Sequence, residues 1–212
     1  MKTDDLINML ASGDVKPEPI PVARIATQIA LGVLVAIALM ATFLGVRDNL
    51  LQVLMLPAFW MKFIFVIALA SVGLTATRRL SSPGVKTGRV PVMLAVPIVI
   101  IWSIAAVSLM TAAPGERAEL FWGDTWKVCP FLIAGLSIPI FIAILRAMRE
   151  LAPTRLRLAG AAAGLTAGAA AATVYCLHCP EMAAPFVGFW YVLGMSIPTV
   201  VGALIGPRAL RW

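Results

Sequence analysis

Six long apolar stretches divide this chain of 212 residues and leave little sequence between them. A helix needs about 20 mainly apolar residues to cross the hydrocarbon core of a bilayer. Stretches of about this length lie at 25–46, 56–76, 91–112, 128–145, 156–176 and 185–206. The connecting segments are too short for a separate soluble domain. The sequence therefore predicts an all-α integral membrane protein in which six transmembrane helices form one bundle.

Charged residues make up 13% of the chain, against about 25% in soluble domains, and the basic ones are unevenly placed. Cytoplasmic loops of membrane proteins carry an excess of Lys and Arg. With a cytoplasmic N-terminus, thirteen of the 17 basic residues are cytoplasmic: three in 1–24, four in 77–90, four in 146–157 and two after 206. Three more lie in the opposite loops. Both termini are therefore predicted to be cytoplasmic. The net charge of +7 serves this topology, so we expect no nucleic-acid partner.

The seventeenth basic residue, Lys62, lies early in the second apolar stretch. We expect its aliphatic stem to carry the charge to the outer surface of the membrane. No acidic residue falls inside an expected helix and Lys62 is close to one edge, whereas pumps and carriers place ionisable groups near the middle of the membrane. The chain also lacks phosphate-loop, nucleophile-elbow and zinc-protease patterns. We therefore expect neither an ion carrier nor an enzyme, and no cofactor.

The first 24 residues form a polar, proline-containing leader that differs from a signal peptide. A signal peptide has a short basic start followed by about 7–15 apolar residues. This leader has mixed charge, and the apolar run that follows it is long enough to span. We expect an uncleaved first helix, with 1–24 as a cytoplasmic tail and 25–212 as the transmembrane domain.

The tail itself contains a predicted amphipathic helix of about ten residues. Thr3 can cap this helix, and Asp4 and Asp5 fall in its first turn, where the helix dipole favours negative charge. Its apolar face consists of Leu6, Ile7, Met9 and Leu10. So short a helix is marginal alone in water, which favours folding against a groove on a partner. A disordered leader is the alternative.

Small residues dominate the fifth apolar stretch. Gly160, Gly164 and Gly168 are four residues apart and therefore line one face of a helix. Without side chains in the way, a neighbouring helix can approach this face closely. Tight packing within the bundle is the simplest interpretation, and the same face could also serve a homodimer.

Thiols gather at the predicted outer end of the bundle. Cys129 opens the fourth apolar stretch, Cys176 closes the fifth, and Cys179 lies in the short loop before the sixth. His178 and Glu181 lie in the same loop. In a bacterium this side is the oxidising periplasm, where disulfides persist.

Three interpretations of these residues remain open. Cysteine is common in apolar segments as a small hydrophobic residue. A zinc site would use four ligands, Cys129, Cys176, His178 and Cys179, and softer metals would suit the thiolates equally well. Cys176 and Cys179 also form a Cys-x-x-Cys motif, which can lower a thiol pKa. A thiol relay usually needs a second pair, and only one further cysteine is present.

Three segments together resemble the NrsF family of membrane anti-sigma factors, the negative regulators of sigma-F. They are "TDDLINMLA" at the start, "CP" at the opening of the fourth apolar stretch, and "HCPEMAAPFVGFWYVLGMSIPTVVGALIGPRALRW" at the end. The resemblance implies a six-helix inner-membrane protein that holds an extracytoplasmic-function (ECF) sigma factor through its cytoplasmic N-terminus. It also implies that two periplasmic-side cysteines sense stress, including heavy metals. Carried onto this chain, the sensor thiols are Cys129 and Cys179, each followed by proline, with His178 as a further candidate metal ligand.

The resemblance leads to one main hypothesis and one alternative. The main hypothesis is an anti-sigma factor whose Asp4, Asp5, Leu6, Ile7 and Leu10 bind a sigma factor until a thiol-reactive stress releases it. The alternative is a membrane thiol-redox or metal-handling protein that uses the same cysteines. A sigma factor retained by residues 1–24 would distinguish them, since a redox protein has no need of that interaction.

Overall fold

The computed structural model describes residues 3–5, 22–81, 88–151 and 153–211 of the chain. All the regular structure in these residues is helical. The elements are α2 (Val22–Leu39), a π-helical turn (Met40–Leu44), α3 (Leu50–Val53), α4 (Pro57–Ser81), α5 (Val90–Thr111), α6 (Arg117–Trp122), α7 (Cys129–Arg149), α8 (Leu156–Tyr175), α9 (Ala184–Phe186), a second π-helical turn (Val187–Tyr191) and α10 (Val192–Ala209).

Six of these helical segments are long and apolar enough to cross a membrane, which confirms the predicted number. They span Ala26–Leu44, Pro57–Ser81, Val90–Thr111, Cys129–Arg149, Leu156–Tyr175 and Ala184–Ala209. Each begins within one residue of the start expected from the sequence. Large apolar side chains are exposed along their outer faces, as in Val92 at 65% and Leu204 at 69%. Such surfaces suit lipid and not water, so the chain is a multi-pass membrane protein.

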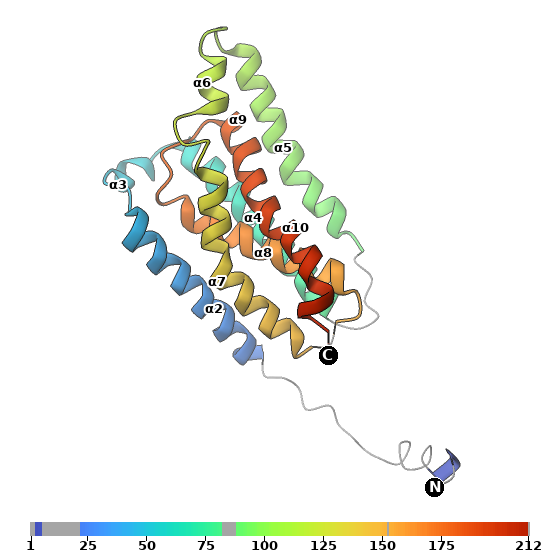
Figure 1. The fold of residues 1–212 in the computed structure, drawn as a ribbon. Coiled ribbons are helices and arrows are strands. Elements are labelled where there is room, and N and C mark those ends of the chain that lie inside the picture. Colours follow the sequence, from blue (N-terminus) through green and yellow to red (C-terminus); the bar gives the residue numbers. More distant parts are fainter. Residues whose placement is uncertain (1–2, 6–21, 82–87, 152, 212) are drawn as a thin grey trace.

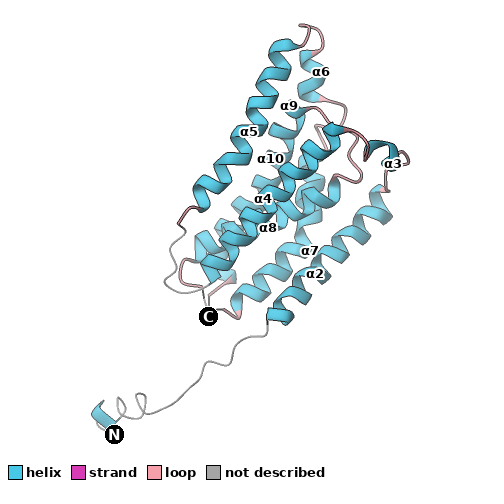
Figure 2. Cartoon of the chain, turned by 180° about the vertical axis from the view of Figure 1, so that it is seen from behind, coloured by secondary structure: helices cyan, strands magenta, loops and turns pink. Residues whose placement is uncertain are grey.

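Helix α8 lies at the centre of the bundle, and the small side chains along it explain why. It packs against α10, α4 and α7, while α2 rests on α7 and α5 rests on α4 and α9. Figures 1 and 2 show α2 and α5 on opposite flanks, and the start of α2 and the C-terminus at the same end. Lipid tails are as apolar as leucine, so close van der Waals contact between small residues drives such packing. We call the end that holds the start of α2 and the C-terminus the terminal end, and the opposite one the thiol end.

The glycine face of α8 contacts α10, as the simplest interpretation of the sequence predicts. A Cβ atom on Gly160 would collide with the carbonyl oxygen of Gly202, and one on Gly164 with that of Pro198. The two backbones are therefore in direct contact. This face is covered within the chain and gives no support to the homodimer that the sequence left possible.

Irregular turns interrupt two of the spanning segments at the thiol end. The π-helical turn of the first span ends at Gly45, whose φ of 79° favours glycine. The second π-helical turn carries Trp190 and Tyr191 and joins α9 to α10. Such bulges are frequent at functional sites because they redirect side chains out of the helical register.

Candidate thiol site

The three cysteines lie together at the thiol end, where three helix ends meet. Cys129 is the first residue of α7, Cys176 follows α8, and Cys179 lies in the loop before α9. All three are free and buried, with exposed fractions of 0%, 2% and 0%. The Cys129 and Cys179 side chains lie within interaction distance of each other. The structure thus brings together the two thiols that the family resemblance selects.

The surroundings of Cys179 and Cys176 make these two thiols chemically different. The hydrogen bond from Cys129 lowers the pKa of the Cys179 thiol, with a further contribution from the nearby Lys62 ammonium. Burial raises the pKa of Cys176 to about 12. Since the thiolate is the nucleophile and the metal ligand, the lowered pKa makes Cys179 the better candidate nucleophile of the Cys-x-x-Cys motif.

His178 is hydrogen-bonded to the backbone at the end of the first span. Its Nδ1 lies 3.0 Å from the carbonyl oxygen of Gly45. A carbonyl oxygen can only accept, so Nδ1 carries the proton and donates. Across the described ranges, no group of three or more His, Cys, Asp or Glu side chains is arranged to hold a metal ion. The structure therefore does not assemble the zinc site that the sequence allowed. A thiophilic metal held by Cys129 and Cys179 stays a prediction.

The loop that carries Cys179 is fastened to two segments distant in sequence. Glu181 accepts hydrogen bonds from the Asp124 N–H at 2.8 Å and the Thr125 hydroxyl at 3.5 Å, just before Cys129. Arg47 donates its N–H to the Leu177 carbonyl and its Nη1 to the Pro180 carbonyl, both at 3.3 Å.

Lys62 is the functional candidate that the sequence interpretation missed. We expected its charge to reach the membrane surface, but the residue is 0% exposed. Its Nζ donates to the carbonyl oxygens of Cys179, at 3.0 Å, and Glu181, at 2.9 Å, and lies 5.7 Å from the centre of the Tyr191 ring. The expectation was wrong because α4 faces the Cys179 loop at this point and supplies acceptors inside the protein. Its position near the start of an apolar helix, at the same level as the cysteines, was the feature of the sequence that could have indicated this role.

Aromatic rings surround the α6 side of the thiol end. Trp190 donates its indole N–H to the Phe121 carbonyl at 2.9 Å. Neighbouring ring centres in this cluster lie 4.7–6.1 Å apart, among Phe121, Trp122, Trp126, Phe189 and Trp190. Tryptophan is enriched where a membrane meets water, so the cluster is suited to anchor this end of the bundle at an interface.

The chain as a whole matches a known protein family. The family described as "NrsF: Negative regulator of sigma F" matches residues 10–212. The chain belongs to the NrsF family.

Two NrsF relatives align along their full lengths. The "Probable anti-sigma-F factor NrsF" of Azospira oryzae is 56% identical over 213 residues, and the "Anti-sigma-F factor NrsF" of Caulobacter vibrioides is 36% identical over 215 residues. Each alignment covers 100% of both chains. Both names describe regulatory proteins and not enzymes, in agreement with the expectation from the sequence. No solved structure matches the chain.

The predicted partner-binding residues of this NrsF chain lie in its tail. Residues 3–5 are helical, and Asp4 and Asp5 are exposed. Leu6, Ile7 and Leu10 lie outside the described residues, so the amphipathic helix beyond residue 5 stays a prediction.

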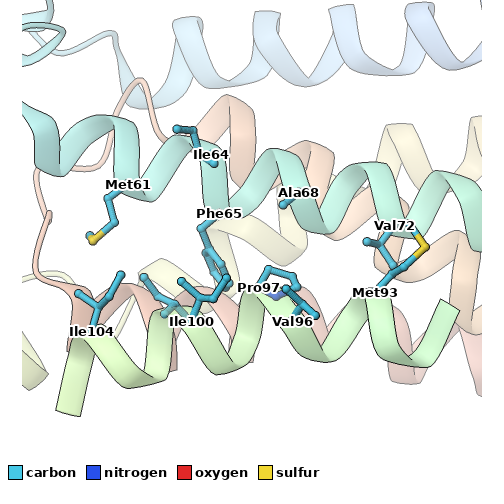
Figure 3. Close-up of a pocket in the computed structure, with 11 residues that line it drawn as sticks. Met61, Ile64, Phe65, Ala68, Val72, Met93, Val96, Pro97, Ile100 and Ile104 are labelled. Atoms are coloured by element: carbon cyan, nitrogen blue, oxygen red, sulfur yellow. The ribbon is translucent and has the colours of Figure 1, made fainter. Parts of the chain in front are cut away.

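An apolar groove lies between α4 and α5, and its lining offers no reactive side chain. Its volume is about 480 Å³, and Phe65 of α4 points across it toward Pro97 and Ile100 of α5 (Figure 3). None of the eleven residues that line it carries a titratable or hydrogen-bonding side chain. In a membrane-spanning chain this groove fits lipid tails, so the candidate site of the NrsF chain is the thiol end.

Proposed function

We propose that this chain is a membrane anti-sigma factor that holds an ECF sigma factor through its cytoplasmic tail and releases it when a thiol-reactive stress reaches Cys129 and Cys179. The observation that carries the proposal is the full-length match to proteins named as anti-sigma-F factors. A sigma factor as partner follows from that match. The ECF class, the inner membrane as location and the thiol trigger come from the family resemblance and from the chemistry of the site.

The tail supplies the proposed contact with the sigma factor. Sigma factors present basic residues to DNA, and Asp4 and Asp5 offer complementary charge from an exposed position. Leu6, Ile7 and Leu10 would bury against an apolar groove beside those basic residues. The transmembrane domain then keeps the bound sigma factor at the membrane and away from polymerase.

The thiol pair supplies the proposed trigger. An oxidant that accepts two electrons and two protons would convert the Cys129 and Cys179 thiols into a disulfide, and a thiophilic cation would instead be held between two thiolates. Either change fastens the start of α7 to the loop before α9. Proline residues inside α7 and α10, Pro139 and Pro198, provide places where such a shift could bend these helices toward the terminal end.

The low pKa of Cys179 also favours the alternative, a membrane thiol-redox or metal-handling protein. Cys179 interacts with Cys129 at the start of α7, in addition to being spaced from Cys176 as a Cys-x-x-Cys motif. A redox relay would cycle this pair without a protein partner in the cytoplasm. Retention of a sigma factor therefore decides between the two functions.

Co-purification tests the proposal directly. We expect the full chain in native-like membranes to retain the sigma factor, and cadmium or diamide to release it. A Cys129→Ser, Cys179→Ser variant should retain the sigma factor under both conditions, because serine preserves size but lacks thiolate chemistry. The matched control, Cys176→Ser, should respond like the unchanged chain. Undiminished release from the double variant would contradict a sensing role for these two cysteines.

Membrane topology provides a second prediction. With both termini in the cytoplasm, a reporter active only in the periplasm should be silent when fused after Trp212. The same reporter placed between α5 and α6, near Gly115, should be active. Periplasmic activity at the C-terminus would invert the bundle and put the thiols in the reducing cytoplasm.

A further inference from the structure

Lys62 is the one buried charged side chain among the described residues, at 0% exposure. Its ammonium lies inside an apolar span and makes no ion pair with a carboxylate in the described part of the chain. Burying a charge without an opposite charge is costly, and such groups inside membrane domains usually have a function. Topology does not explain this lysine, because it does not reach the surface.

The contacts of Lys62 are with the backbone of one short loop. Its Nζ binds the carbonyls of Cys179 and Glu181, while Arg47 binds the carbonyl of Pro180 between them. Three successive carbonyl oxygens are thus held by two cations. Pro180 has no N–H and cannot continue a helix, so this segment has no ladder of its own to fix its path. The two cations take over that task.

The side chain of Glu181 completes the arrangement. Its carboxylate accepts hydrogen bonds from the Asp124 N–H and the Thr125 hydroxyl. Thr125 lies four residues before Cys129. Lys62 thereby fixes the loop from the α4 side, and Glu181 fixes it from the α7 side. Cys179 lies between these two attachments with its thiol against Cys129.

We propose that Lys62 is a positioning residue of the thiol site, which holds the Cys179–Glu181 backbone so that the Cys179 sulfur meets the Cys129 sulfur. This inference rests on the proposed function, in which that pair is the sensor. Lys62 forms no bond to either sulfur atom, and its ammonium also helps to lower the pKa of Cys179. It sets the fraction of time during which the two sulfur atoms are close enough to react.

The rate of disulfide formation tests this role. The full chain carries Cys176→Ser, so that Cys129 and Cys179 are the only thiols, and is held in lipid nanodiscs. Diamide accepts the two electrons and two protons as the sulfur–sulfur bond forms, and mass spectrometry follows the bridged peptide. Lys62→Met should slow bridging by about tenfold or more, because two hydrogen bonds to a charged donor are lost. Lys127→Met, an exposed lysine beside the same site, should remain within about twofold of the parent.

Two further variants separate positioning from general stability. Lys62→Arg can donate to both carbonyls and should restore the rate to within about threefold of the parent. Lys62→Gln offers shorter, neutral donors, and its bridging rate should fall between those of Lys62→Arg and Lys62→Met. If Lys62→Met does not fold, the Lys62→Gln rate tests the proposal in its place. Bridging at the parent rate in a folded Lys62→Met or Lys62→Gln chain would overturn the proposal. No sigma factor is present in this assay, so its result does not depend on the proposed function. If co-purification showed that the chain retains no sigma factor, the proposed function would be refuted and the bridging result would still stand.

Discussion

A Leu6→Ala, Leu10→Ala double variant should switch on the genes controlled by the sigma factor without any stress. Truncating a buried anchor at a protein interface commonly costs about 2 kcal/mol, or roughly thirtyfold in affinity. Two independent anchors would together weaken binding by roughly nine-hundredfold. The measurement is reporter expression from a promoter of the sigma factor, alongside the amount of sigma factor that remains with the membrane fraction.

Asn8→Ala provides the matched control, since Asn8 lies in the same predicted helix and does not belong to its apolar face. It should repress as well as the unchanged chain. Full repression by the double variant would place the docking face elsewhere, with the basic segment at 77–90 as the next candidate. A loss of the chain from the membrane would show up in the same fractions and separate misfolding from lost binding.

Substitution of Gly164 by leucine should prevent assembly of the bundle. The first side-chain carbon would collide with the carbonyl oxygen of Pro198, and a backbone atom cannot rotate away as a side chain can. Overpacking of an ordinary core costs about 1–3 kcal/mol, and separating two helices in backbone contact should exceed that range. We expect little monodisperse protein in mild detergent, and a large fall in Tm for whatever remains.

Gly135→Leu is the corresponding control. Gly135 also lies inside a spanning helix, α7, but a Cβ atom there would have nothing within 4 Å. This variant should therefore purify like the parent and unfold at a similar temperature. Equal behaviour of the two variants would mean that α8 and α10 do not pack through their glycines.

The sequence was sufficient for the helices because hydrophobic length is a local property. The starts of the spans agree with expectation to within one residue, whereas several helices continue beyond the expected end. In α4 the extra turn contains Arg78 and Arg79. Cations near the C-terminus of a helix are favoured by its dipole, so the helix extends beyond the end of its apolar segment.

The site was only partly predictable because its bonds join distant segments. The positions of Cys129 and Cys179 at one level follow from the order of the helices. Lys62 and its acceptor on Cys179 are separated by 117 residues, and no spacing rule connects them. His178 was expected near the sulfur atoms because it precedes Cys179, but neighbours in a turn can point in different directions, and its ring faces Gly45.

The burial of the three cysteines changes what limits their reaction. A reagent in the surrounding water meets no thiolate until the covering loop opens, so the observed rate is the intrinsic rate multiplied by the fraction of open molecules. A mild or brief oxidant would pass without effect, although an exposed thiolate of the same acidity would react at once. Under the proposed function, the burial of these thiols would therefore act as a kinetic filter. Such a filter would separate sustained chemical stress from the ordinary redox background of the compartment that the thiol end faces.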